Sequence, residues 1–153
     1  MVKSPKLYLA DSGLACTLTR QPSADAALAG AMSGALFEGW VVSEAVKAFA
    51  HQGKRPELYF WRSHDGLEVD LLIRAADKLI PVEVKLTATP TPRHVQPLER
   101  FKQLADDTAA QQGVLVCRVT ARRPLPHGHV ALPWHEFPGW LRERLNVEAS
   151  AGT

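Results

Sequence analysis

The chain has 153 residues, of which 46% are hydrophobic, and its formal net charge is +2. This length and apolar content predict a single globular domain with a buried core, and the small net charge neither requires nor excludes a polyanionic partner. Cys16 and Cys117 are too far apart to form a CxxC pair, which argues against a zinc ribbon and a disulfide-rich secreted scaffold. No stretch approaches the roughly 20 apolar residues that a membrane-spanning helix needs. We therefore expect a cytoplasmic protein with no membrane partner.

The first third of the chain is predicted to be mainly helical. Lys6–Ala10 alternates leucine with polar or small residues, which is typical of a short strand, and the turn-forming residues 11–13 end it. An alanine-rich run favours a helix over 24–31, and a longer helix is expected over 34–51 with Ser33 as its N-cap.

Strand-like runs dominate the middle of the chain. Short connections separate three of them, which implies an antiparallel meander: 57–62, 67–73 and 79–86. A helix is expected over 98–110, and an apolar strand of the kind buried on both faces over 113–119. Residues 122–133 are polar and broken by proline, and a closing helix over 135–145 is expected to be interrupted near Pro138.

This order of elements predicts an α/β fold with a three-strand antiparallel meander plus a further strand, flanked by helices. The chain shows no internal repeat, which fits one domain. We expect three parts, namely a first strand with a helical lead-in, the α/β domain and a flexible tail: residues 1–32, 33–145 and 146–153.

Two carboxylates and a lysine are predicted to meet on neighbouring strands. Residues two apart on a strand point to the same face, so Glu83 and Lys85 project together, as do Glu68 and Asp70. If residues 76–77 form a two-residue loop, Asp70 falls directly opposite Glu83, with their Cβ atoms about 5 Å apart. Carboxylates this close repel each other unless a hard divalent cation such as Mg²⁺ or Mn²⁺ binds both. We therefore expect Asp70 and Glu83 to be metal ligands, and Lys85 to stabilise developing negative charge or position an attacking water.

Glu38 is a further candidate, on the long helix. It shares a helical face with Val42, Ala45 and Phe49, so it should point toward the sheet. An inward glutamate is costly unless it is paired or bound to a metal, which makes Glu38 a candidate accessory ligand or water-orienting residue. Glu44 lies on a neighbouring stripe and is a weaker candidate.

The order and spacing of Glu38, Asp70 and the Glu83-x-Lys85 pair resemble the PD-(D/E)xK phosphodiesterase superfamily, which includes restriction enzymes and Holliday-junction resolvases. Val69 stands where the superfamily pattern has proline. The chain is more closely similar to a C-terminal domain of unknown function carried by many prokaryotic AAA-type ATPases. That similarity covers roughly residues 3–105 and rests on these segments: KLYL at 6–9, DSGL at 11–14, FE at 37–38, WRS at 61–63, GLEVD at 66–70 and EVK at 83–85.

These resemblances imply a restriction-endonuclease-like core and a Mg²⁺-dependent endonuclease acting on DNA, with Glu38, Asp70, Glu83 and Lys85 as catalytic residues. In the ATPase family an ATP-binding domain and a winged helix precede this segment, but no GxxxxGK[ST] phosphate loop occurs in the chain. We therefore expect a C-terminal fragment of a longer ATPase, with the ATPase domain as partner, or a stand-alone remnant of one. The alternative is a non-catalytic regulatory or interaction module of the ATPase, in which these residues survive as a polar cluster. A homo-oligomer is compatible with the sequence.

Three other groups of residues allow more than one interpretation. Trp61 and Arg62 could hold a nucleic-acid backbone, but a core tryptophan and a surface arginine are the simpler expectation. A basic group could follow phosphates or form an ordinary solvated surface: Arg118, Arg122 and Arg123. Three histidines raise a zinc hypothesis that no cysteine or carboxylate cluster supports: His127, His129 and His135.

Overall fold

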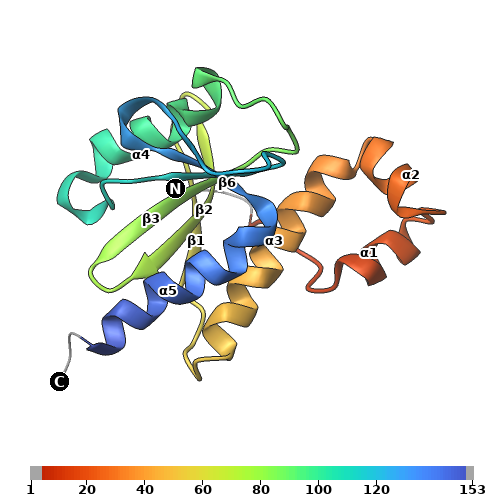
Figure 1. The fold of residues 1–153 in the computed structure, drawn as a ribbon, viewed down its shortest axis with the longest axis horizontal. Coiled ribbons are helices and arrows are strands. Elements are labelled where there is room, and N and C mark those ends of the chain that lie inside the picture. The colour runs from red at the N-terminus through yellow and green to blue at the C-terminus, as the bar shows by residue number, and fades with distance from the viewer. Residues whose placement is uncertain (1–4, 151–153) are drawn as a thin grey trace.

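One six-stranded mixed sheet organises the fold, in a computed structural model that describes residues 5–150, with side chains through Asn146. The strands lie in the order β1-β2-β3-β4-β6-β5, with the bounds β1 Leu58–Arg62, β2 Glu68–Ala75, β3 Lys78–Val84, β4 Val114–Cys117, β5 Arg123–Pro124 and β6 Val130–Pro133. Helices α3 Ser33–Ala50 and α5 Phe137–Ser150 pack on one face of the sheet, and α4 Gln96–Ala105 packs on the other (Figure 1). The predicted α/β class with flanking helices is therefore confirmed.

The antiparallel meander of β1, β2 and β3 is present as predicted. Ala75 pairs with Lys78, so residues 76–77 are the expected two-residue loop, and Ala76 has the positive φ, 51°, that such loops use at their first position. The register continues to Leu71 opposite Val82. The next step of this ladder is the one that holds Asp70 and Glu83.

Side-chain alternation along β2 is interrupted beside Asp70. β1 pairs Tyr59 with Leu72 but Trp61 with Val69, so β2 has one more residue than β1 over this stretch. As a result, Val69 and Leu72 pack in the same cluster, although strict alternation would place them on opposite faces. The strict alternation assumed for this strand is therefore wrong here. Bulges of this kind redirect side chains and are common beside active sites.

Two apolar clusters hold the helices to the sheet. Between the sheet and the layer of α3 and α5, the buried side chains include Val41, Ala45, Phe49, Ile73, Val82, Phe137 and Leu141. On the other face, α4 buries Leu98 and Phe101 against Val69 and Leu72. Burial of this apolar area is the main force that fixes the hairpin in place.

The helices differ from the predictions in several places, and α4 ends at Ala105 instead of residue 110. Met32, not Ser33, is the N-cap of α3, and it makes no side-chain cap. α5 is not interrupted at Pro138, because proline is tolerated in the first turn, where its missing N–H is not needed. α5 also continues to Ser150, into the segment predicted to be a flexible tail, and residues 151–153 lie outside the described part of the chain.

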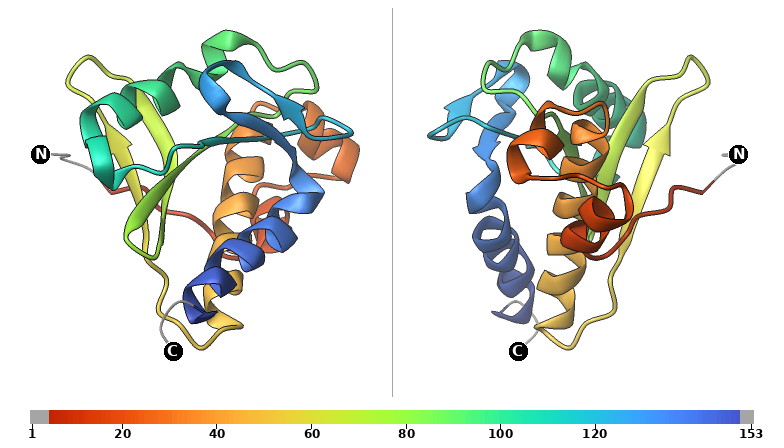
Figure 2. Two further views of the ribbon diagram at one scale, coloured as in Figure 1. Left: turned by 60° about the vertical axis from the view of Figure 1, so that its left-hand side comes forward. Right: turned by 90° about the vertical axis from the view of Figure 1, so that its right-hand side faces the viewer.

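The N-terminal region departs most from the sequence prediction. Residues 5–10 are extended but pair with no strand, so the predicted strand at 6–10 is wrong, and they cross from the side of β1 toward α3 (Figure 2). Two short helices follow and lie beside α3, away from the sheet (Figure 1): α1 Ser12–Leu18 and α2 Ala24–Ala29. The sequence analysis missed α1, whose N-cap Asp11 accepts the Leu14 N–H at 2.9 Å.

The second half of the sheet contains two strands that the sequence did not predict, β5 and β6. β4 pairs in parallel with β3 and β6, and β5 pairs antiparallel with β6 at the sheet edge. Proline is tolerated there because Pro124 lies on an edge strand and Pro133 ends β6. Short 3₁₀ turns complete the chain: η1 Pro92–Val95, η2 Asp106–Thr108, η3 Pro126–Gly128 and η4 Trp134–Glu136. Within residues 5–150, no helix has the length and hydropathy to cross a membrane.

Candidate active site

Asp70 and Glu83 lie where β2 and β3 separate. Val84 donates its backbone N–H to Asp70 Oδ2 at 3.0 Å, so a side chain replaces a bond between the two strands. One residue later, Lys85 donates its backbone N–H to the Val116 carbonyl at 3.1 Å, which keeps this end of β3 joined to β4. These bonds fix the Asp70 carboxylate against β3.

Lys85 bridges the two carboxylates. Its Nζ lies 2.7 Å from Glu83 Oε1 and 3.4 Å from Asp70 Oδ2. The Lys85 side chain is 41% exposed, whereas those of Glu83 and Asp70 are 4% and 10% exposed. The structure therefore brings the three predicted residues together, and the lysine links a buried acidic pair to the surface.

Burial controls the protonation of this pair. It raises the pKa of Glu83 to about 7, and the charge of Asp70 adds to the effect. Burial also raises the pKa of Asp70, although the charge of Lys85 and the Val84 N–H act in the opposite direction. For Lys85, burial alone would lower the pKa, but the negative charges of Glu83 and Asp70 outweigh it and raise the pKa. One ammonium is therefore insufficient to make two buried negative charges favourable.

Glu83 also has an oxygen without a protein partner. Among the described side chains, Glu83 Oε2 is the buried polar atom for which no hydrogen bond is found. An unpaired buried acceptor costs about 1–3 kcal/mol of stability, and more when it is charged. A ligand that binds this atom would remove that cost. This unpaired oxygen, on a carboxylate that shares Lys85 with Asp70, is the feature that suggests a bound cation.

The donor chemistry of Asp70 and Glu83 fits a hard cation. Within the described part of the chain, no group of three or more histidine, cysteine, aspartate or glutamate side chains is placed to hold a metal ion. Mg²⁺ does not need such a group, because one or two carboxylates and several waters commonly bind it. Zinc, which prefers nitrogen and sulfur ligands, is a poor match.

Glu38 approaches the same region from α3. Lys6 lies between the acidic residues: its Nζ is 2.9 Å from Glu38 Oε1 and 3.7 Å from Asp70 Oδ1, and it forms an ion pair with Glu68 Oε1. Tyr8 donates its hydroxyl to Glu38 Oε1 at 2.5 Å. The structure thus brings Glu38 close to Asp70, but with a lysine between them.

Sequence reasoning missed Lys6 and Tyr8 as members of this cluster, whereas it placed Glu68 beside Asp70 without giving it a role. For Glu68, burial would raise the pKa, but hydrogen bonds from Lys6 and Arg62 lower it overall. The available signal was the KLYL segment at 6–9, in which polar residues alternate with leucine. That pattern predicts a strand, whereas the structure has no strand there and half-buries Lys6 and Tyr8 while both leucines are exposed.

Other candidates serve structural roles. Trp61 packs edge-to-face on Phe101 with ring centroids 5.7 Å apart, and Arg62 pairs with Glu68, as expected for a core tryptophan and a surface arginine. Glu44 pairs with a lysine one turn along α3.

The structure also gives partners to one of the three histidines and to one of the three arginines that formed the other candidate groups. His129 is buried, its Nδ1 accepts the Gly113 N–H at 2.9 Å, and its Nε2 lies 3.2 Å from Glu99 Oε2. These partners occupy both ring nitrogens, which leaves no reason to invoke zinc. Arg122 pairs with Glu136 at 2.6 Å.

The fold and the site define an α/β domain with a buried carboxylate pair and an adjacent lysine. Residues 33–137, more than half of the chain, match the domain of unknown function DUF4143, so the chain belongs to that family. Two mycobacterial proteins are 30% identical to it over 89 residues: the uncharacterized proteins Mb2031c of Mycobacterium bovis and Rv2008c of Mycobacterium tuberculosis. The matched region is 58% of this chain but only 19% of each relative. No solved structure matches the chain.

Proposed function

We propose that the chain is a PD-(D/E)xK-type phosphodiesterase domain that requires Mg²⁺ or Mn²⁺ and acts on DNA. The observation that carries the proposal is the buried pair of Asp70 and Glu83, bridged by Lys85, with Glu83 Oε2 lacking a protein partner. A buried carboxylate pair becomes favourable when it is protonated or shared with a cation. The order of α3, a three-strand meander, α4 and a parallel strand agrees with the core that the sequence resemblance implies.

Each residue has a distinct role in this proposal. Asp70 and Glu83 would hold the divalent cation through their ionised oxygens. When bound, such a cation lowers the pKa of a coordinated water and polarises a phosphoryl oxygen. Lys85 places its ammonium where negative charge develops on the phosphate. Glu38 would be an accessory ligand, or would accept a hydrogen bond from a water molecule and so orient it, once its contact with Lys6 is released.

The sheet edge beside the site supports an anionic substrate. β3 and β4 run parallel, so their carboxyl ends meet at one edge, and the Arg118 N–H donates to the Thr87 carbonyl there at 2.7 Å. The Arg118 side chain is exposed just after β4, near this edge. An exposed arginine near the proposed metal site can contact a backbone phosphate, which supports a nucleic acid as substrate.

A second candidate is a non-catalytic regulatory module of an AAA-type ATPase. The observation that favours it is Lys6, which forms ion pairs with Glu38, Glu68 and Asp70 and so gives these carboxylates a counter-ion from the chain itself. The ATPase domain as a partner is part of this proposal, and the relatives extend far enough beyond the matched region to contain one. Folds of enzymes are reused for binding, so intact side chains do not decide between the two.

A plasmid-nicking assay separates the candidates. We expect the wild-type protein to nick supercoiled plasmid with Mg²⁺ or Mn²⁺ and to lose this activity with a chelator or the substitution Glu83→Ala. Glu57→Ala is the matched control, because Glu57 is a half-exposed glutamate paired with Arg74 next to β1. If the wild type binds Mg²⁺ but cuts neither DNA nor RNA, alone or joined to the ATPase portion, the regulatory module is the better conclusion.

A further inference from the structure

Lys6 is the cation that the structure places among the carboxylates of the proposed site. Its Nζ contacts Glu38, Glu68 and Asp70, and only 23% of its side chain is exposed. The ring of Phe60 lies beside it, with the centroid 5.7 Å from Nζ. A lysine from outside the sheet therefore contacts all three of these carboxylates.

Asp70 has an ammonium near each of its oxygens. Lys6 Nζ is 3.7 Å from Oδ1, and Lys85 Nζ is 3.4 Å from Oδ2. A divalent cation bound to the same carboxylate would repel both ammonium groups, so its binding is favoured when one of them moves away. Lys85 directly follows β3 and is fixed by its backbone bond to Val116. Lys6 is therefore the residue that can leave.

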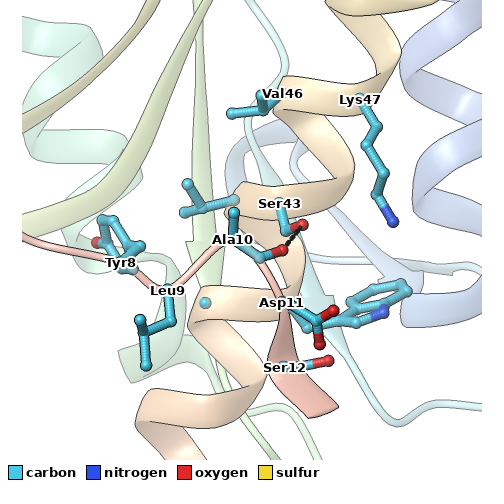
Figure 3. Close-up of a pocket in the computed structure, with 11 residues that line it drawn as sticks. Tyr8, Leu9, Ala10, Asp11, Ser12, Ser43, Val46 and Lys47 are labelled. Atoms are coloured by element: carbon cyan, nitrogen blue, oxygen red, sulfur yellow. Dashed lines mark hydrogen bonds between the residues drawn. The ribbon is translucent and has the colours of Figure 1, made fainter. Parts of the chain in front are cut away.

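Few polar contacts hold the segment that carries Lys6. Residues 5–10, called the N-terminal segment below, pair with no strand. Apart from Lys6, the segment is held by the Tyr8 hydroxyl, which donates to Glu38 Oε1 at 2.5 Å, and by the Ser43 hydroxyl, which donates to the Ala10 carbonyl at 2.6 Å (Figure 3). Two of these attachments end on one carboxylate, because Lys6 and Tyr8 both bind Glu38 Oε1.

Apolar packing adds little to this attachment. Leu7 is 95% exposed and Leu9 is 48% exposed, so the leucines of the N-terminal segment bury little surface. A cavity of about 440 Å³ lies along the segment and α3, lined by residues that include Tyr8, Leu9 and Val46 (Figure 3). Segments with few buried apolar contacts detach at low free energy.

We propose that the N-terminal segment is autoinhibitory, with Lys6 acting as a tethered competitor of the divalent cation at Asp70. The inference rests on the metal site proposed above. While Lys6 is in place, Glu38, Glu68 and Asp70 share its charge, and the affinity of the site for a divalent cation is low. When the segment detaches, these carboxylates lose their counter-ion and the affinity rises. Cation binding and detachment therefore favour each other by the same factor.

Calorimetric titration with Mn²⁺ tests the competition. Lys6→Met keeps the length of the side chain but removes its charge, and we expect it to bind Mn²⁺ about tenfold more tightly than the wild type, within the usual range for coupled ligands. Lys78→Met is the matched control and should bind like the wild type, because Lys78 lies at the turn of the hairpin, where it donates to the Asp107 carbonyl at 2.6 Å. Tyr8→Phe retains Lys6 but removes one attachment, so a smaller gain of a few-fold is expected.

Limited trypsin digestion gives a readout that does not depend on these variants. Mn²⁺ should speed cleavage after Lys6 in the wild type, although bound ligands usually protect a protein, because Lys6 becomes accessible when the segment detaches. Unchanged or weaker Mn²⁺ binding by Lys6→Met, together with an unchanged cleavage rate after Lys6, would overturn the autoinhibitory contact. If Glu83→Gln still abolishes binding in that case, the metal site itself stands. If no form of the protein binds Mn²⁺, the site and the inference are both wrong.

Discussion

Glu83→Gln removes a buried charge that the metal-free protein has to accommodate, so we expect it to stabilise the fold above neutral pH. Burial raises the pKa of Glu83 from 4.5 to about 7. Since one pKa unit corresponds to about 1.36 kcal/mol, ionised Glu83 lowers the free energy of unfolding by about 3 kcal/mol. The favourable contact with Lys85, which is 41% exposed, is already included in this shift, because it lowers the pKa of Glu83. The gain is therefore about 3 kcal/mol, or about 6–12 °C in melting temperature.

The pKa of Glu83 determines the direction in which the stability of the wild type changes with pH. Below pH 4.5 Glu83 is protonated in the folded and unfolded states, and between pH 4.5 and about 7 only the folded state keeps the proton, so stability falls as pH rises. Above that window the full loss is present. The glutamine variant cannot titrate, so its advantage over the wild type should be small at pH 5, about a quarter of its full size, and nearly complete at pH 8.

Thermal melts in EDTA at pH 5 and pH 8 measure this difference. Glu57→Gln is the control, because that side chain is 48% exposed and should change the melting temperature little at either pH. A Glu83→Gln variant that is less stable than the wild type at pH 8 would refute the reasoning. An advantage of equal size at both pH values would do the same, because the gain would then not come from a titrating charge.

Three further outcomes follow from the contacts. Asp70→Asn should abolish the rise in melting temperature that Mg²⁺ gives the wild type, and an unchanged metal response in thermal melts would count against Asp70 as a ligand. Burial lowers the pKa of His129, and protonation would remove the acceptor for the Gly113 N–H, so stability should fall as pH drops below 6.5; urea midpoints should show a shallower fall for His129→Asn, and an identical slope would contradict this origin. Phe137→Ala should lower the free energy of unfolding by about 3–5 kcal/mol, because the side chain is fully buried; a loss below about 1 kcal/mol in urea titrations would be inconsistent with its place in the core.

The central hairpin could be predicted from sequence because its signals are local. The strand-forming residues of β2 and β3 flank residues 76–77, and a two-residue loop leaves one register, which sets Asp70 opposite Glu83. The buried β4 was also visible as an apolar run. Local pattern therefore sufficed for the scaffold of the proposed metal site.

The N-terminal segment could not be predicted in this way. Its alternation of polar residues and leucine is a strand pattern, but a strand also needs a free edge, which depends on the rest of the fold. The contacts of Lys6 with Glu38 and Asp70 join residues far apart in sequence, so no local rule reports them. The bulge beside Asp70 could not be predicted either, because it is defined by the pairing of β2 with β1.

The central claim is that Asp70 and Glu83 hold a cation while Lys85 acts on the phosphate. Lys85→Ala tests it most directly when Mg²⁺ affinity and plasmid nicking are measured on the same sample. We expect Mg²⁺ affinity at least as high as that of the wild type and loss of nicking, because the ammonium repels the cation but stabilises the negative charge that develops on the phosphate. Wild-type nicking by Lys85→Ala, or nicking that continues in the wild type without any divalent cation, would contradict the account.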